Sequence, residues 1–300
     1  MSSETNDNFK RLSLGATIQK TFVLYGRGFK TLTLLYALTT VLIGLTWSIL
    51  LVFLNPVFEI DAGKLTDPEY LLAHIKGFYA MLGIYMLVCL AIGSVMTGPV
   101  IRAIVDLYMG KKPNVKHCLK VGVMRAHTIC CASVVGSFLV CIGMIFLLFP
   151  GMYLCLRWFF VSPIIVVEGL GVFGSLKRSW NLAAGSCCYV FCVFTILQTL
   201  MIVLNMVWQM LLGIEGSGAL FSVYGALVSL VPCIILGPIF SIVITLMYLN
   251  MRIEKEGLNE SELIRNMGES GALEGVYTSL ATEEGVDESP LLDQELDVAV

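Results

Sequence analysis

The chain has 300 residues, of which 57% are hydrophobic and only 14% are charged. A soluble domain carries about 25% charged residues, so this composition excludes an ordinary water-soluble globular protein. The formal net charge of −3 hides an uneven distribution, because residues 264–300 hold nine acids and one base, Arg265. We therefore expect an all-α, polytopic membrane protein that ends in an acidic tail.

Six apolar stretches are long enough to be membrane-spanning helices, which need about 20 mostly apolar residues each. In chain order they cover residues 31–54, 78–101, 128–149, 152–167, 186–214 and 218–250. The fourth stretch is short and is interrupted by Arg157. Because Pro150 and Gly151 follow the third stretch directly, the third and fourth spans are expected to form a tight hairpin with almost no exposed connection.

Lysine and arginine gather before the first span and after the second, fourth and sixth, whereas the opposite side has only Lys64 and Lys76. The positive-inside rule then predicts three hairpins with both termini in the cytoplasm. The chain is thereby divided into a cytoplasmic N-terminal segment with an amphipathic helix (1–30), a six-helix transmembrane domain (31–250) and a largely disordered, acidic cytoplasmic tail (251–300).

A short amphipathic segment precedes each odd-numbered span. Its apolar residues share the offsets 0, +4, +8 and +11, which keep them within a stripe of about 80° on a helix. The three sets are Leu14, Ile18, Phe22 and Tyr25; Val115, Leu119, Val123 and Ala126; and Val172, Leu176, Trp180 and Ala183. Basic residues lie off each stripe, so we expect these helices to lie in the inner-leaflet interface and bind anionic lipid head groups.

Each even-numbered span also contains a proline, at Pro99, Pro163 and Pro238. Together with the amphipathic segments this pattern indicates a threefold internal repeat, of a kind that transporter folds often use. The alternative is that basic cytoplasmic connections are common to all proteins built from membrane hairpins.

Two runs of the sequence carry a family resemblance. The run LRWFFVSPIIVVEGLGVFGSLKRSWNLAAG (156–185) has an arginine, a proline and a glutamate followed by an amphipathic segment, and YLNMRIEKEGLNESEL (248–263) has an arginine and a Glu-Gly pair. They resemble the integral membrane domain of certain bacterial glycerophosphodiester phosphodiesterases and related stand-alone membrane proteins of bacteria and archaea. The resemblance covers about residues 10–263 and implies a six-helix membrane domain. It does not imply phosphodiesterase activity, because the catalytic domain of those fusions is a separate soluble barrel.

Arg157 is the only ionisable residue well inside a predicted span, and such residues mark candidate sites because they are costly in lipid. Its candidate partners are Glu168 and Asp106. A straight helix would separate Arg157 from Glu168 by about 16 Å, so a direct pair is not expected. Arg157 is expected instead to bind backbone carbonyls near Pro163, to extend toward the interface, or to contact a phosphate head group.

Gln198, Asn205 and Gln209 lie on one face of the fifth span. Amides in this arrangement hydrogen-bond neighbouring helices, or, as the alternative, line a path for a solute. Four further residues start the third and fifth spans and are candidates for S-acylation, with helix packing as the alternative: Cys130, Cys131, Cys187 and Cys188. The sequence shows no catalytic constellation and no metal-ligand spacing, so no enzyme activity, cofactor, metal or nucleic-acid partner is expected.

The acidic tail contains two short patterns, YTSL (277–280) and DESPLL (287–292). They resemble the tyrosine and dileucine signals that clathrin adaptors bind in eukaryotic cells. The residues concerned are Tyr277, Leu280, Asp287, Leu291 and Leu292. An endosomal, lysosomal or vacuolar membrane is predicted for a eukaryotic protein, and the inner membrane for a prokaryotic one.

These observations favour a non-catalytic multi-pass membrane protein that organises the lipid bilayer or serves as an accessory subunit, with sorting signals in its tail. The alternative is a transporter of a small solute or a lipid, which would use Arg157 and the amide face of the fifth span.

Overall fold

The computed structural model describes residues 14–53, 68–212, 219–259 and 261–266. All regular structure within these ranges is helical, which confirms the all-α prediction. The helices are α2 (Leu14–Phe53), α4 (Pro68–Tyr108), α5 (Val115–Phe146), α6 (Leu148–Arg157), α7 (Val161–Glu168), α8 (Val172–Ala183), α9 (Cys187–Leu211) and α10 (Ala219–Glu256). A final helical segment covers residues 261–266.

The described residues contain six helices that are long and apolar enough to cross a membrane. They are Gly15–Leu50, Leu72–Tyr108, Val115–Phe146, Phe149–Glu168, Cys187–Leu211 and Leu230–Glu256. This confirms the prediction of an integral, multi-pass membrane protein with six apolar helices. The fourth of these stretches consists of α6 and α7, with a break at residues 158–160.

The first and third of these helices are longer than expected, because the amphipathic segment before each continues into the span without a break. Only the third amphipathic segment, α8, is a separate helix. Gly185 ends it with a left-handed φ of 76°, a conformation that glycine adopts without the penalty a Cβ would bring. The three segments therefore share the spacing of their apolar residues, but only the third is separated from the span that follows it.

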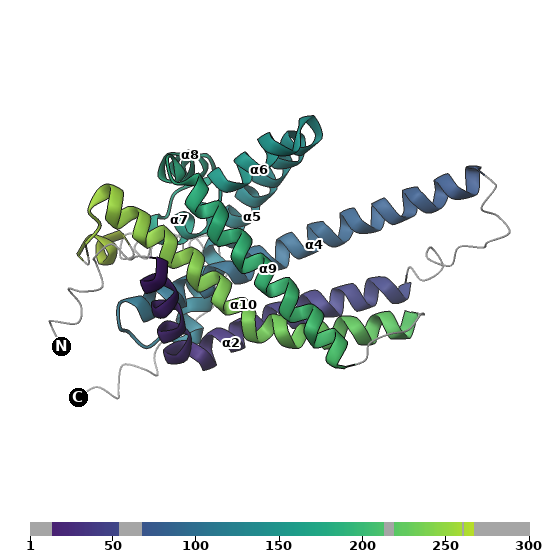
Figure 1. Ribbon diagram of the computed structural model, residues 1–300, viewed down its shortest axis with the longest axis horizontal. Helices are drawn as coiled ribbons and strands as arrows, with labels where there is room; N and C mark the ends of the chain where they lie inside the picture. The colour runs from purple at the N-terminus through teal and green to yellow at the C-terminus, as the bar shows by residue number, and fades with distance from the viewer. Residues whose placement is uncertain (1–13, 54–67, 213–218, 260, 267–300) are drawn as a thin grey trace, which may run out of the picture.

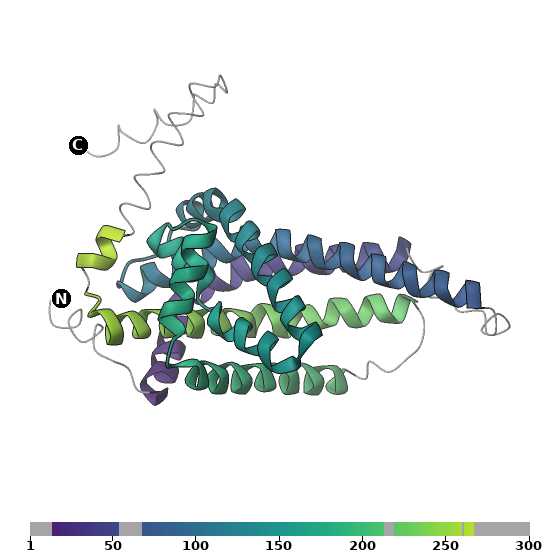
Figure 2. The same ribbon diagram turned by 90° about the horizontal axis from the view of Figure 1, so that it is seen from above.

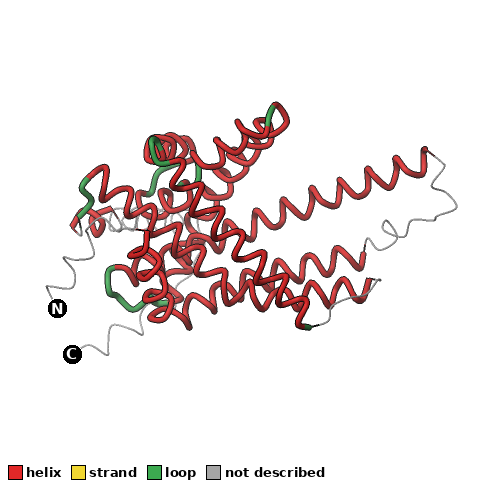
Figure 3. The backbone as a smooth tube through the Cα atoms, in the orientation of Figure 1, coloured by secondary structure: helices red, strands yellow, loops and turns green. Residues whose placement is uncertain are grey.

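Most of α2, α4 and α10 run along the long axis of the molecule, which is horizontal in Figures 1 and 2, whereas α9 runs obliquely to this axis in Figure 1. The first turns of α2 run across this axis, and so does α8, which Figure 1 shows end-on. Figure 3 shows the loops after α4 and after α10 at the same end of the molecule. We call the end that holds α8 and the last turn of α10 the α8 end.

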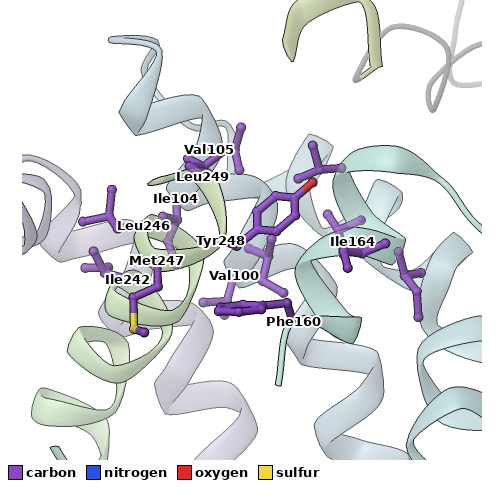
Figure 4. Packing of buried hydrophobic residues seen from close by; sticks show 14 of the residues in the cluster. Val100, Ile104, Val105, Phe160, Ile164, Ile242, Leu246, Met247, Tyr248 and Leu249 are labelled. Carbon is purple, nitrogen blue, oxygen red and sulfur yellow. The ribbon is translucent and has the colours of Figure 1, made fainter. Parts of the chain in front are cut away.

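The buried apolar residues gather at the α8 end. They come from residues 24–35 of α2, the second half of α4, the first half of α5, α7, part of α8 and the second half of α10, with one residue each from α6 and α9. Tyr248 is fully buried among them, and Figure 4 shows its ring beside Val100, Phe160 and Ile164. Close helix packing of this kind stabilises membrane proteins through van der Waals contact.

α4 and α5 cross where each helix has a glycine, Gly98 in α4 and Gly122 in α5. A Cβ added at Gly122 would overlap with the ring of Pro99, and one added at Gly98 would lie 2.8 Å from the Cα of Gly122. Glycine at both positions therefore lets the two helices approach closely. The proline of the second span is thus part of a helix contact.

The helices separate at the opposite end, which we call the far end. α4 diverges there from α2 and α10 (Figure 1), and its residues Tyr79, Met86 and Leu87 are exposed. α9 has Val190 as its one buried residue. Exposed apolar surface of this extent fits contact with acyl chains, not with water.

α5 and α6 are separated by a single residue, Leu147, at which the chain reverses. α6 runs back close to α5. A Cβ on Gly143 would lie 3.0 Å from the Cα of Gly151, and one on Gly136 would lie 4.0 Å from the ring of Trp158. Gly143 and Gly151 thus bring the two arms together next to the turn.

Candidate functional site

A connected group of charged side chains lies at the α8 end, centred on Glu168. Its carboxylate accepts hydrogen bonds from the Tyr248 hydroxyl at 2.8 Å and from Nε of Arg178 at 3.0 Å. Nε of Arg252 lies 3.6 Å from the same carboxylate. Glu168 is the last residue of α7, where the negative end of the helix dipole disfavours an anion. The two arginines compensate for that unfavourable position.

Arg252 is the most deeply buried of the charged residues in this group, with 4% of its side chain exposed. Its guanidinium donates to Glu256 at 3.1 Å, to the Tyr248 hydroxyl at 3.3 Å and to Glu262 at 3.3 Å. A buried guanidinium is stable only when its donors are paired in this way. Arg252 thereby joins α10 to the helical segment 261–266 that follows it.

Two basic residues, one from each helix, fix α8 to α10. Arg178 of α8 donates to Glu256 at 2.6 Å, and Lys255 of α10 donates to the Leu182 carbonyl at 2.7 Å, in the last turn of α8. Burial alone would lower the pKa of Arg178, but its contacts with Glu256 and Glu168 outweigh burial and raise that pKa above its usual value. Lys255 also caps carbonyls that the end of a helix leaves unpaired.

α8 is also fixed to the break between α6 and α7. The Ser179 hydroxyl donates to the Arg157 carbonyl at 2.8 Å and accepts from the Phe160 amide at 3.2 Å. Nη1 of Arg157 donates to the Trp180 carbonyl at 2.9 Å, and its guanidinium carbon lies 4.7 Å from the Trp180 ring. These contacts satisfy backbone groups that the break frees.

We call this whole arrangement the α8 clamp. It consists of Arg157, Glu168, Arg178, Ser179, Tyr248, Arg252, Lys255, Glu256 and Glu262. It holds one short helix, which lies across the long axis, against three others.

The two ionisable residues singled out from the sequence, Arg157 and Glu168, both belong to the clamp but pair with different partners. Arg157 binds the Tyr153 hydroxyl at 2.8 Å and the Trp180 carbonyl, whereas Glu168 binds arginines of α8 and α10. Asp106, the other candidate partner, lies 3.4 Å from Nε of Arg102. The carbonyl that Arg157 binds therefore belongs to α8 and not to the backbone near Pro163.

The amide residues of α9 lie closer to the far end. Gln209 donates to Asn205 at 2.7 Å, and Asn205 approaches the Cys233 sulfur of α10 at 3.9 Å. Gln198 is exposed two turns before Asn205. The structure thus brings two of the three predicted amides together and joins one of them to a neighbouring helix.

The candidate acylation sites differ in exposure. Cys131 and Cys188 are exposed, whereas Cys130 and Cys187 are half-buried, and the Cys187 thiol donates to the Ala183 carbonyl at 3.3 Å. The sorting residues lie outside the described residues: Tyr277, Leu280, Asp287, Leu291 and Leu292. Among the residues that the structure describes, there is no group of His, Cys, Asp or Glu that could hold a metal ion.

The amphipathic stripes face different surroundings despite their identical spacing. In α2, Ile18 and Phe22 are exposed, because Thr17, Thr21 and Leu24 form the face that packs on the protein. In α8 the stripe faces inward instead, with Leu176 and Ala183 buried, Val172 and Trp180 half-buried, and Phe173 and Lys177 exposed. The stripe of α5 is mixed, since Ala126 is buried and Val123 is exposed.

Sequence reasoning missed most of the clamp. Arg178 and Lys177 are the basic residues beside the α8 stripe, and such residues were expected to bind lipid head groups, although only Lys177 is exposed. Tyr248, Arg252 and Glu256 fall at the end of the last span, where they look like ordinary interfacial residues. A useful signal was available, because the two runs 156–185 and 248–263 contain every residue of the clamp.

Comparison with known proteins leaves the family open. No protein-family model matches the chain, and neither a search of curated proteins nor a search of solved structures gave a match.

Proposed function

We propose that the protein is a non-catalytic multi-pass membrane protein that organises the lipid around it or acts as an accessory subunit. Its six apolar helices form three hairpins, and both termini and the α8 end lie on the cytoplasmic side. The observation that carries this proposal is the α8 clamp, which fixes a helix across the long axis with Phe173 and Lys177 pointing outward.

The charge distribution supports this placement. Exposed lysines on the α5 and α8 segments share the α8 end with the exposed apolar residues Phe22 and Phe173. They are Lys116, Lys120 and Lys177. Apolar residues beside lysines are typical of helices that bind anionic lipid at an interface. The donors of Arg157, Arg178 and Arg252 are engaged within the protein, which supports a structural role for the clamp and not a catalytic one.

A lipid-selectivity measurement tests this proposal. Full-length protein is reconstituted with a spin-labelled anionic lipid or its neutral analogue, and the motionally restricted fraction of each is measured. We expect the wild type to restrict the anionic lipid preferentially, and K116E/K120E/K177E to lose most of that preference. Lys76→Glu, at an exposed position of α4 near the far end, is the matched control. Equal restriction of both lipids by the wild type contradicts the proposal.

Transport of a small solute or a lipid is a second candidate function, and the hydrogen-bonded Asn205–Gln209 pair on α9 favours it. A flux assay in liposomes separates the two candidates. A transporter loses flux in Asn205→Leu and Arg157→Leu, whereas an organising protein shows no flux above empty liposomes in any form.

The tail is proposed to direct the protein to an endosomal, lysosomal or vacuolar membrane through clathrin adaptors in a eukaryotic cell. Its two patterns in the sequence, YTSL and DESPLL, support this proposal. Replacing Leu291 and Leu292 by alanine in a fluorescently tagged protein is expected to shift it to the cell surface. An unchanged distribution contradicts the dileucine signal.

A further inference from the structure

The turn between α5 and α6 is apolar throughout. Ile145, Phe146, Leu147 and Phe149 are 83%, 79%, 64% and 75% exposed. No charged residue, histidine, asparagine or glutamine occurs in the sequence between His127 and Arg157. The exposed side chains of this turn cannot form hydrogen bonds with water or with lipid head groups, so water is an unfavourable surrounding for the turn.

The other two connections at the far end are different in sequence. Residues 54–67 contain Glu59, Asp61, Lys64 and Asp67, and residues 213–218 contain Glu215. Charged residues of this kind belong in water outside the membrane. The contrast within one chain indicates that the α5–α6 turn occupies a different depth from its two counterparts.

The length of α6 gives that depth. Arg157, at the end of α6, binds the Trp180 carbonyl and so lies at the level of α8. From there α6 has 10 residues to the turn, which is about 15 Å of helix. The hydrocarbon core of a bilayer is about 30 Å thick, so a hairpin that starts from an interfacial α8 ends near the middle.

The other arm of the hairpin agrees. Gly136 of α5 lies opposite Trp158, the residue after Arg157. The part of α5 from Gly136 to Phe146 rises by about 15 Å. Figures 1 and 2 share their horizontal axis, and in both the α5–α6 turn ends short of the far ends of α2, α4 and α10, close to the level at which the oblique helix α9 ends.

We propose that α5 and α6 form a half-membrane hairpin, whose turn lies near the middle of the hydrocarbon core and contacts the acyl chains of the leaflet on the α8 side. The chain then crosses the membrane four times and enters it once more from the α8 side without crossing. This inference rests on the proposed position of α8 at the cytoplasmic interface. It also gives the organising function a physical means, since the hairpin displaces acyl chains in one leaflet only.

Depth-dependent fluorescence quenching tests the proposal on the full-length protein in liposomes. An environment-sensitive fluorescent amino acid is introduced at position 147 by stop-codon suppression, which leaves all native cysteines in place. The quenchers are lipids with a nitroxide in the head group, high on the acyl chain or at the chain end, and aqueous iodide. We expect the chain-end nitroxide to quench most and iodide to have no effect.

Two results overturn the hairpin. Strongest quenching by the head-group nitroxide or by iodide means that the turn crosses to the far interface. Absence of quenching by every lipid means that protein, such as a second copy of the chain, covers the turn. The same measurement at position 149, on the other side of the turn and 75% exposed, decides the matter if the first variant does not fold.

Labels at positions 61 and 215 distinguish this proposal from the proposed orientation. Both are expected to be quenched by iodide from the side opposite α8. If they report from the α8 side while position 147 reports the chain ends, the proposed crossings of α2, α4, α9 and α10 fail and the half-membrane depth stands. If vesicles show no lipid selectivity but position 147 reports the chain ends, the organising function alone fails.

Discussion

The α8 end and the far end of the molecule are built from the same apolar residue types but are stabilised in different ways. At the α8 end, helices from α2 to α10 bury side chains against each other, and ion pairs join α8 to α7 and to α10. At the far end, helices separate and present Tyr79, Met86 and Leu87 outward. The comparison teaches that the protein's own contacts define its shape mainly at one end, and that the other end exposes apolar surface, which is stable only in apolar surroundings.

The strongest way to break this comparison is to remove Arg252. Arg252→Ala leaves Glu168 and Glu256 with one arginine partner fewer in a buried site, which costs roughly 3–5 kcal/mol for a buried ion pair. The free energy of unfolding, measured by denaturant titration in mixed micelles, is expected to fall by that amount. Lys111→Ala, at an exposed position of the same end, is the control and is expected to change little. Equal effects of the two substitutions would show that the clamp is not what holds this end together.

Overpacking the α4–α5 crossing is expected to have the next largest effect. Gly122→Ala places a methyl group against the ring of Pro99, and overpacking of this kind costs about 1–3 kcal/mol. Gly83→Ala, in the diverging part of α4, meets no atom within 4 Å and adds helix propensity. We therefore expect the change from glycine to alanine to lower the free energy of unfolding at position 122 and to raise it at position 83. The same denaturant titration measures both. A loss of stability in both variants would contradict the difference between the ends.

A smaller effect is expected from Ser179→Ala. The substitution removes two hydrogen bonds that attach α8 to the α6–α7 break, with a net contribution of about 1–2 kcal/mol. Hydrogen exchange of the α8 amides is expected to speed up while α10 amides are unaffected. Ser137→Ala, at an exposed position of α5, serves as the control. Uniform acceleration in both helices would mean that α8 does not open separately.

The smallest change in stability is expected on the outward face of α8. Phe173→Ser removes a side chain that is 77% exposed and should alter the unfolding free energy by no more than about 0.5 kcal/mol. Leu176→Ser, at a buried position of the same helix, is expected to be far more destabilising. If the two variants are equally destabilised, Phe173 packs on protein and does not face lipid.

How much of this was predictable depends on which physical signal each feature leaves in the sequence. The apolar helices were predicted because an apolar run of about 20 residues has the length that a membrane-spanning helix needs. The extension of α2 and α5 through their amphipathic segments was missed, since nothing in the residues before Thr31 or Thr128 marks where a span begins. The break at residues 158–160 was also missed, because Trp158 and Phe160 are as apolar as their neighbours.

The α8 clamp was harder to predict for a different reason. Arg178 and Lys177 are adjacent bases on one amphipathic segment, and only the packing of α8 on α10 decides which of them meets an acid. A local pattern cannot show this, since Arg178 and Glu256 are 78 residues apart. For the same reason, the identical offsets of the three apolar stripes do not show which stripe packs on the protein and which is exposed.

The contact between Arg252 and Glu262 carries a mechanical consequence for the acidic tail. The point at which the tail leaves the protein is anchored by the same guanidinium that neutralises Glu168. A force applied to the segment 261–266 therefore reaches α10 through the backbone and reaches Glu168, at the end of α7, through the Arg252 guanidinium.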